Sequence, residues 1–232
     1  PAYEGDSPYI FKEKYSPTLG LTGDAIILRH VLEHIPNPLD FLASIAERNK
    51  GGLIYIEVPC LDWIRDNRSW LDLNYEHVNY FRLINFLCMF DRIIDSGHLF
   101  GGQYLYVIAD LDSFRQYPLG HDDAAPFFDF ADGLLSRAAL IIIRHPERKK
   151  ILWGAASKGV LFAMHVGVPL DFAIDINPAK QGKYMPLTGL QVLSPEDGLP
   201  RLSPRDTIFV MNKNYLKEIQ AIAGDKFAYC IV

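Results

Sequence analysis

The chain has 232 residues, of which 49% are hydrophobic and 22% are charged, a composition typical of ordinary globular domains. Its formal net charge of −5 argues against a nucleic-acid-binding surface, which usually needs a basic stripe. No apolar run approaches the roughly 18 residues of a membrane span, and the three scattered cysteines form neither a Cys-x-x-Cys metal site nor a secreted disulfide framework.

In the first half of the chain, short apolar runs alternate with amphipathic segments, which is the pattern of an α/β domain. The helical spacing of Leu39, Leu42 and Ile45 predicts a helix that Gly51-Gly52 ends. The predicted elements are, in chain order, a strand at 25–28, a helix at 39–48, a strand at 53–58, an aromatic-rich loop with short helical turns at 61–81, a helix at 83–94 and a strand at 103–109.

The second half repeats this alternation after a linker, predicted at 110–125 from Pro118, Gly120 and several aspartates. The elements expected after the linker are a helix at 127–144, a strand at 150–153, a glycine-rich turn at 154–159, a helix at 160–166, strands at 172–176 and 207–211, a helix at 215–223 and a strand at 227–232. We therefore predict one domain over 1–112, a linker and connecting helix over 113–147, and a smaller domain over 148–232.

The first candidate site follows the strand at 25–28. In an open α/β sheet, ligands bind beyond the carboxyl ends of the strands, where Arg29 and His30 lie, with His34 shortly after. The alternative is a strand-to-helix turn whose histidines only cap or pack.

The surrounding run resembles class I methyltransferases over roughly residues 23–59, where it is similar to the fourth strand, its helix and the fifth strand of that family. The resemblance implies that Arg29, His30 and His34 contact the cofactor, S-adenosylmethionine. It rests on Asp-Ala-Ile-Ile-Leu-Arg-His-Val-Leu-Glu-His-Ile at 24–35, then Asn37-Pro38, a helix, Gly51-Gly52 and the strand at 54–59.

A second candidate is the Glu76-His77 pair on the aromatic-rich loop. An imidazole titrates near neutral pH and a neighbouring carboxylate can orient it, so the pair suits proton transfer. The alternative is a surface loop in which His77 bonds to the backbone. The stretch resembles the Tyr-x-Glu-His-x-x-Tyr-Phe loop of sugar C-3 methyltransferases, which implies that His77 is the base, with support from Glu76 and Tyr75. Asn74 stands at the family's tyrosine position, and we expect Asn74 and Tyr80 to face the substrate.

The phrase His98-x-x-Gly101-Gly102 also resembles that sugar methyltransferase family, in which the glycines let the backbone lie close to the sugar. The resemblance implies that Gly101, Gly102 and the following Gln103 contact the substrate.

A third candidate is the turn at 153–159, which follows a strand and opens a helix. Its small residues, including Gly154 and Ser157, expose backbone N–H groups at a helix start, and Lys158 adds a positive charge. This combination suits an anion such as a diphosphate. Because the turn is neither a Walker loop nor a full Gly-x-Gly-x-x-Gly, a plain strand-to-helix turn is the alternative.

Two later phrases resemble the C-methyltransferase C-terminal domain over roughly residues 152–219. One is its Asp-x-x-Pro-x-Lys-Gly/Gln-Gly-x-x-x-Pro-Gly/Thr signature, which begins here at Asp175. The other is its Trp-Asn-Tyr-x-x-Glu-Ile phrase, which matches from Asn214 with Lys213 in place of tryptophan.

The residues of this domain suggest a substrate set. Lys158, Lys180 and Lys183 near strand ends suit a diphosphate, and Asp175 at a strand end suits a ribose hydroxyl. We add Tyr184 and Asn214 as substrate contacts. The alternative is a solvated rim of lysines in which Asp175 caps the next turn.

Two features of the resembled families are absent before Gly23: the Gly-x-Gly cofactor loop, and a cysteine-rich zinc-binding region. We therefore expect that an N-terminal segment is missing, so that residues 1–112 are the C-terminal part of a methyltransferase domain, or that the chain is a non-catalytic remnant.

Taken together, these patterns predict an α/β fold: a partial class I methyltransferase (Rossmann-like) sheet followed by a second, smaller Rossmann-like α/β domain. The resemblance implies an S-adenosylmethionine-dependent C-methyltransferase acting on a nucleoside-diphosphate keto-sugar. A non-catalytic nucleotide-sugar binding module and an O- or N-methyltransferase are the alternatives. We expect a cytoplasmic protein with no metal, no nucleic-acid partner and no membrane partner; a homo-oligomer is left open.

Overall fold

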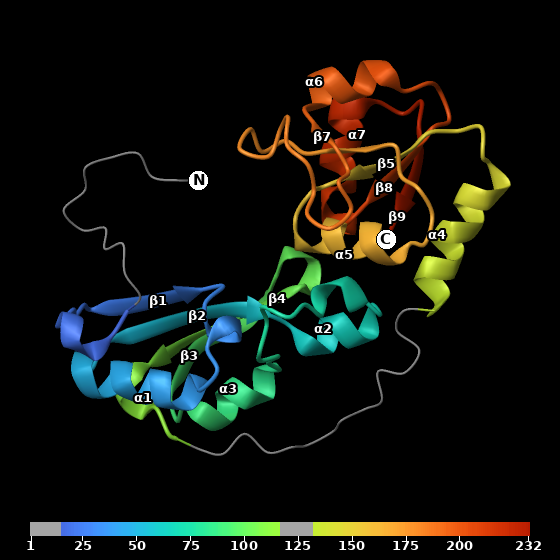
Figure 1. The fold of residues 1–232 in the computed structure, drawn as a ribbon. Helices are drawn as coiled ribbons and strands as arrows, with labels where there is room; N and C mark the ends of the chain where they lie inside the picture. Colours follow the sequence, from blue (N-terminus) through green and yellow to red (C-terminus); the bar gives the residue numbers. More distant parts are fainter. Residues whose placement is uncertain (1–14, 117–131) are drawn as a thin grey trace. The chain divides into compact units, whose positions relative to one another are not determined.

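The computed structural model describes residues 15–116 and 132–232, which divide into two compact units (Figure 1). Among these residues, the first unit comprises 15–59, 78–97 and 105–116, and the second comprises 60–77, 98–104 and 132–232. Two segments of the N-terminal half, 60–77 and 98–104, therefore pack with the C-terminal α/β body. Among the described helices, none is long and apolar enough to cross a membrane.

The first unit is built on a mixed four-stranded sheet with the order β1-β2-β4-β3. β1 (Ala25–Arg29) runs parallel to β2 (Leu53–Pro59), with Ala25 opposite Leu53 and Arg29 opposite Glu57. The other elements are η1 (Pro17–Leu19), η2 (Leu32–His34), α1 (Pro38–Asn49), α3 (Leu83–Met89), β3 (Ile93–Leu99), β4 (Tyr104–Asp110) and η5 (Leu111–Ser113).

One face of this sheet packs against α1 and α3, which lie along the same side of it in Figure 1. Ile54 and Ile56 of β2 are fully buried, two residues apart as one face of a strand requires. Leu42 and Ile45 of α1 are also buried, at helical spacing. This apolar layer fixes the register of β1 against β2, and with it the residues at their carboxyl ends.

The second unit has an all-parallel sheet with the order β7-β6-β5-β8-β9. The strands are β5 (Lys150–Trp153), β6 (Phe172–Ile174), β7 (Val192–Leu193), β8 (Thr207–Val210) and β9 (Ala228–Ile231). Around them lie α2 (Leu61–Asp66), η3 (Trp70–Asp72), η4 (Phe100–Gly102), α4 (Asp132–Arg144), α5 (Ser157–His165), α6 (Pro195–Gly198), η6 (Leu199–Arg201), η7 (Lys213–Tyr215) and α7 (Leu216–Ala223).

Both faces of the second sheet are buried, as is usual for parallel sheets. On one face, Leu152 and Phe209 pack with Phe162 of α5. On the other, Ile151 and Ile208 pack with residues of α7. Because β6 and β8 flank β5 on opposite sides, the chain order reverses between β5 and β8, which makes this the topological switch point of the sheet.

The α/β fold class predicted from the sequence is confirmed, but several boundaries differ. α5 begins at Ser157, inside the turn predicted at 154–159 and three residues before the predicted helix at 160–166. The helix predicted over 83–94 ends at Met89, and Ile93 begins β3. Phe90 is already extended, and the β-branched pair Ile93-Ile94 favours a strand. β3 was not predicted because polar residues interrupt its apolar pattern, and β7 was not predicted because it has only two residues. The predicted helix at 127–144 is observed from Asp132, while 127–131 and the linker residues 117–125 lie outside the described residues.

Candidate functional site

Near the carboxyl ends of β1 and β2, three polar side chains surround Glu57, which is only 4% exposed. Arg29 Nε donates to Glu57 Oε1 at 3.0 Å, and His30 Nε2 lies 3.1 Å from the same oxygen. Tyr55 donates its hydroxyl to Glu57 Oε2 at 2.6 Å. The predicted residues Arg29 and His30 therefore meet around a carboxylate that the sequence analysis did not single out.

The electrostatics of this cluster keep Glu57 ionised. Burial, the largest influence, raises the pKa of Glu57, but hydrogen bonds from Tyr55 and Arg29 and the charges of Arg29 and His30 lower it below its ordinary value. Burial, and then the bond to Glu57, raises the pKa of Tyr55 to about 12. Tyr55 therefore stays protonated at neutral pH and remains a donor.

A second buried carboxylate lies next to this cluster. Glu33 is 1% exposed, and its Oε1 lies 3.5 Å from His30 Nδ1. Its other oxygen, Oε2, is buried and has no hydrogen-bond partner among the described residues. His30 has a φ of +54°, a strained conformation for a non-glycine residue. His34 lies at the end of η2, in the same connection between β1 and α1.

The Glu76-His77 loop belongs to the second unit and is shaped by Asn74. The Asn74 Oδ1 atom accepts the backbone N–H groups of both Glu76 and His77 at 3.2 Å. Asn74 Nδ2 lies 3.5 Å from His77 Nδ1, and the Tyr75 hydroxyl lies 3.3 Å from Glu76 Oε1. The asparagine at the family's tyrosine position therefore orders this turn through its amide. Tyr80 is a half-buried residue of the first unit, and its substrate contact stays a prediction.

The two glycines of η4 have no Cβ, so the side chains of Trp63 and Asn214 can lie close to their backbone. A Cβ at Gly101 would lie 2.8 Å from Asn214 Oδ1, and a Cβ at Gly102 would lie 2.9 Å from Trp63 Cδ1. Trp63 donates its indole N–H to the Gly101 carbonyl at 3.0 Å, and Asn214 Nδ2 donates to the Phe100 carbonyl at 2.7 Å. These glycines hold Trp63 and Asn214 in place, and their contact with a sugar stays a prediction.

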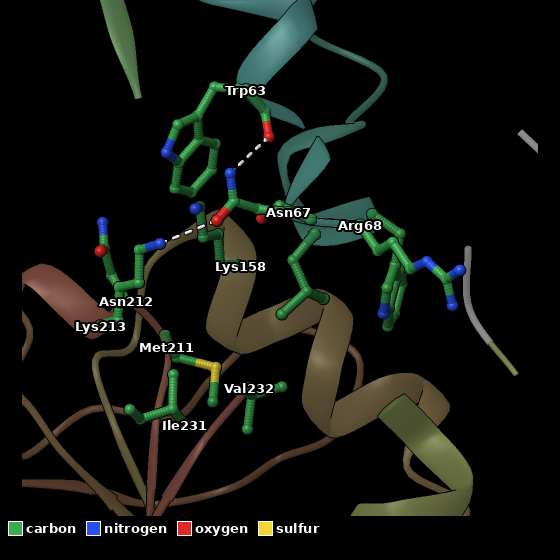
Figure 2. A pocket seen from close by; sticks show the side chains of 12 residues that line it. Trp63, Asn67, Arg68, Lys158, Met211, Asn212, Lys213, Ile231 and Val232 are labelled. Carbon is green, nitrogen blue, oxygen red and sulfur yellow. Dashed lines mark hydrogen bonds between the residues drawn. The ribbon is translucent and has the colours of Figure 1, made fainter. Parts of the chain in front are cut away.

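A pocket of about 130 Å³ lies where the second sheet changes its strand order. Lys158 follows β5, and Asn212 and Lys213 follow β8, so the pocket sits beyond the carboxyl ends of the strands at the switch point, where ligands of open α/β sheets bind. The residues that line it, most of them labelled in Figure 2, are Trp63, Asn67, Arg68, Ser69, Trp70, Leu71, Lys158, Met211, Asn212, Lys213, Ile231 and Val232.

The pocket combines positive charge with an aromatic wall. The Lys158 and Lys213 ammonium groups lie 5.9 Å and 5.3 Å from the centroid of the Trp63 ring, within cation–π range. Lys213 donates to Asn67 Oδ1 at 2.8 Å, and Asn67 donates to the Trp63 carbonyl at 3.0 Å, as the dashed lines in Figure 2 show. Such a pocket suits an anion that carries a flat or apolar group.

Another of the predicted lysines, Lys180, lies at a neighbouring strand end. Its ammonium lies 3.0 Å from Asp175 Oδ2, and the backbone N–H of Ala155 donates to the same oxygen at 2.8 Å. Asp175 is 6% exposed and joins the Gly154 turn to its own loop. The ribose contact of Asp175 stays a prediction, as do the substrate contacts of the exposed Ser157 and of Tyr184, which is 66% exposed.

Several site residues were not identified from the sequence. Glu57 could have been recognised, because a glutamate in the otherwise apolar strand 53–59 needs a partner. Trp63 gave no such signal, and neither did Asp72, whose carboxylate accepts a bond from Lys158 Nζ at 2.6 Å. One aromatic and one acidic residue are unremarkable in a polar, aromatic-rich loop. Lys213 was noted only as a departure from tryptophan.

Comparison with known protein families indicates the class of protein to which this site belongs. Residues 10–92 match a family described as a methyltransferase domain, and residues 130–227 match one described as a C-methyltransferase C-terminal domain. The fold and the first match define the chain as a methyltransferase. The second match, which covers the α/β body around the pocket, identifies this part of the methyltransferase as a C-methyltransferase C-terminal domain. No curated protein matches the chain.

Proposed function

We propose that this methyltransferase transfers the methyl group of S-adenosylmethionine to a carbon beside the keto group of a nucleoside-diphosphate sugar. The observation that carries the proposal is the pocket at the switch point of the second sheet, which presents Lys158 and Lys213 beside Trp63. Two fixed ammonium groups suit a diphosphate, and an aromatic ring suits the face of a base or sugar. The C-methyltransferase match supports carbon as the methylated atom.

In this proposal, Lys158 and Lys213 bind the diphosphate. An ammonium group carries three donors, so each lysine keeps donors for phosphate oxygens beside its bond to Asp72 or Asn67. The Gly154 N–H, which the sequence pattern offered as a donor, donates instead to the Ile174 carbonyl at 2.8 Å. The start of α5 at Ser157 adds backbone N–H groups and the favourable end of the helix dipole.

The polar cluster of the first unit fits the methionine end of the cofactor. Arg29 suits its carboxylate, and Glu57 together with the unpartnered oxygen of Glu33 suits its ammonium group. We propose that Arg29, His30 and His34 contribute to this part of the site. The bound cofactor supplies an electrophilic methyl group.

His77 then removes the proton from the carbon beside the keto group. The Asn74 turn holds the imidazole and the Glu76 carboxylate on neighbouring residues, and Tyr75 lies beside Glu76. Once that proton is lost, the resulting enolate carbon is the nucleophile, and orientation of the sugar against it supplies much of the rate enhancement.

The substrate class is tested by calorimetric titration of the chain with UDP, UMP and uridine, and with dTDP, dTMP and thymidine. If the two lysines bind a diphosphate, affinity falls at each loss of phosphate, and the diphosphate affinity falls as salt concentration rises. Equal binding of nucleoside and diphosphate, or no binding of any diphosphate, would remove nucleoside-diphosphate sugars as the substrate class.

A further inference from the structure

The pocket lysine Lys158 is held by a buried acid from another part of the chain. Lys158 Nζ lies 2.6 Å from Asp72 Oδ2, and the two side chains are 20% and 7% exposed. Asp72 ends η3, in the segment that leads directly into the turn with Glu76 and His77. The ion pair therefore joins the start of α5 to the segment that carries the proposed base.

Asp72 is the centre of a wider polar network. The Ser69 hydroxyl donates to Asp72 Oδ2 at 2.5 Å, and Gln103 Nε2 donates to Asp72 Oδ1 at 3.3 Å. Gln103 is 1% exposed, and its Oε1 accepts from Asn212 Nδ2 at 2.7 Å. The network thus joins η3, the residue after η4, the start of α5 and the segment after β8 through side chains that are buried or half-buried.

We infer that Asp72 is a positioning residue of this site: it fixes the Lys158 ammonium at the pocket and fixes the segment that leads to Glu76 and His77. The positioning of Lys158 for a substrate rests on the proposed function, whereas the positioning of the segment that leads to Glu76 and His77 does not. Asp72 reaches the substrate only through Lys158, so it is not a catalytic residue. A buried carboxylate that accepts three donors, one of them charged, holds them more firmly than neutral bonds would.

The chemistry of the network explains why the conservative variant Asp72→Asn should disrupt it. Both carboxylate oxygens accept donors: Oδ2 from Ser69 and Lys158, and Oδ1 from Gln103. An asparagine has one acceptor oxygen and one donor nitrogen, so its nitrogen must face a donor on one side. Either Gln103 or Lys158 then loses its partner.

The first experiment measures amide hydrogen exchange over residues 69–77 in the full ligand-free chain, which tests the segment independently of any substrate. We expect Asp72→Asn and Lys158→Met each to speed this exchange about tenfold or more, as loss of a charge-assisted bond implies. The double variant should exchange no faster than the faster single variant, because both changes break the same link. Lys158→Arg, which keeps the charge, should restore most of the protection.

The matched control is Lys149→Met. Lys149 belongs to the same unit, and its ammonium bonds to the Arg201 carbonyl instead of a member of the network. Exchange over 69–77 should stay within about twofold of the wild-type rate in this variant. Unchanged exchange in Lys158→Met overturns the inference for the segment. If Asp72→Asn does not fold, the two Lys158 variants decide by the same measurement.

The second experiment titrates the same variants with UDP and dTDP. The direction in which the affinity changes decides between a positioning role and a purely electrostatic effect of Asp72. Removal of a negative charge near a bound dianion should by itself tighten binding. If Asp72 holds Lys158 in place, Asp72→Asn instead weakens diphosphate binding about tenfold, close to the effect of Lys158→Met. Unchanged or tighter binding overturns the positioning of Lys158. If the wild-type chain binds neither diphosphate, the proposed substrate class and the positioning of Lys158 fail together, while the exchange experiment still decides the segment.

Discussion

At the scale of single residues, the candidate site is ordered by polar side chains that each bond to several neighbouring groups. Asn74 orders the turn before His77 with its amide oxygen, and Asp72 receives three donors. The sequence indicates His77 as a candidate base, because an adjacent acid and histidine on an aromatic loop form a local pattern. Asp72 was not, because its partners Gln103 and Lys158 are distant in the chain and only the fold brings them together.

The first prediction concerns the proposed base. In the full-length enzyme, His77→Ala should lower kcat by about two to four orders of magnitude, the usual range for a general base, with little change in sugar binding. Steady-state kinetics with the nucleotide sugar measures both quantities. His145→Ala is the control, because His145 is a partly exposed residue beside Glu147 and outside the site. Near-normal turnover by His77→Ala would remove His77 from the mechanism.

The second prediction concerns diphosphate binding. Lys158→Ala should weaken nucleoside-diphosphate binding by roughly 1–3 kcal/mol, the scale of a hydrogen bond to a charged group. Isothermal titration calorimetry measures the change, with Lys149→Ala as the variant of equal charge. An affinity equal to that of the wild type would leave the turn at 154–159 with a purely structural role.

At the scale of elements, η4 shows how a tight turn positions the site. Gly102 has a φ of +91° and faces Trp63, whereas Gly182 has a φ of +73° and faces open space. Gly182→Ala should therefore cost only the strain of a left-handed alanine, about 1–2 kcal/mol. Gly102→Ala should cost roughly 1–3 kcal/mol more, because Trp63 must move.

Urea unfolding of the two variants measures this difference in the free energy of unfolding. Equal losses in the free energy of unfolding would show that Trp63 moves away from residue 102 without an energetic penalty.

The junction of β1 and β2 gives a pH-dependent prediction. Because the folded pKa of Glu57 is below its ordinary value of 4.5, its contribution to stability is present above pH 4.5 and is lost as the pH falls through the folded pKa. Glu57→Gln should lower stability at neutral pH and flatten the loss of stability in acid.

Urea unfolding at several pH values between 3 and 7 tests this, with the exposed Glu147→Gln as the control. Parallel pH profiles for wild type and Glu57→Gln would show that the bonds from Tyr55, Arg29 and His30 contribute no net stability.

At the scale of the whole molecule, the α/β fold and most elements follow from alternation along the chain. The buried strands β2, β5 and β8 are apolar runs, and α7 has a clear apolar face. β3 was missed because Asp95, Ser96 and Gly97 interrupt its pattern, and β7 because it has two residues. The division into units could not be read from local patterns, because the segments 60–77 and 98–104 join the second unit through partners distant in the chain. These contacts are the polar network around Asp72 and the apolar core that Leu71 shares with Phe162 of α5.

The central claim is that the protein methylates a carbon of a nucleotide-linked keto-sugar. The most direct test incubates the full-length protein with S-adenosylmethionine carrying a ¹³C-labelled methyl group and a panel of nucleoside-diphosphate keto-sugars, and locates the label in the product by NMR. The account predicts a labelled methyl group bonded to a sugar carbon beside the keto group, and its loss in His77→Ala. Label on oxygen or nitrogen, or no transfer to any nucleotide-linked keto-sugar, would contradict it.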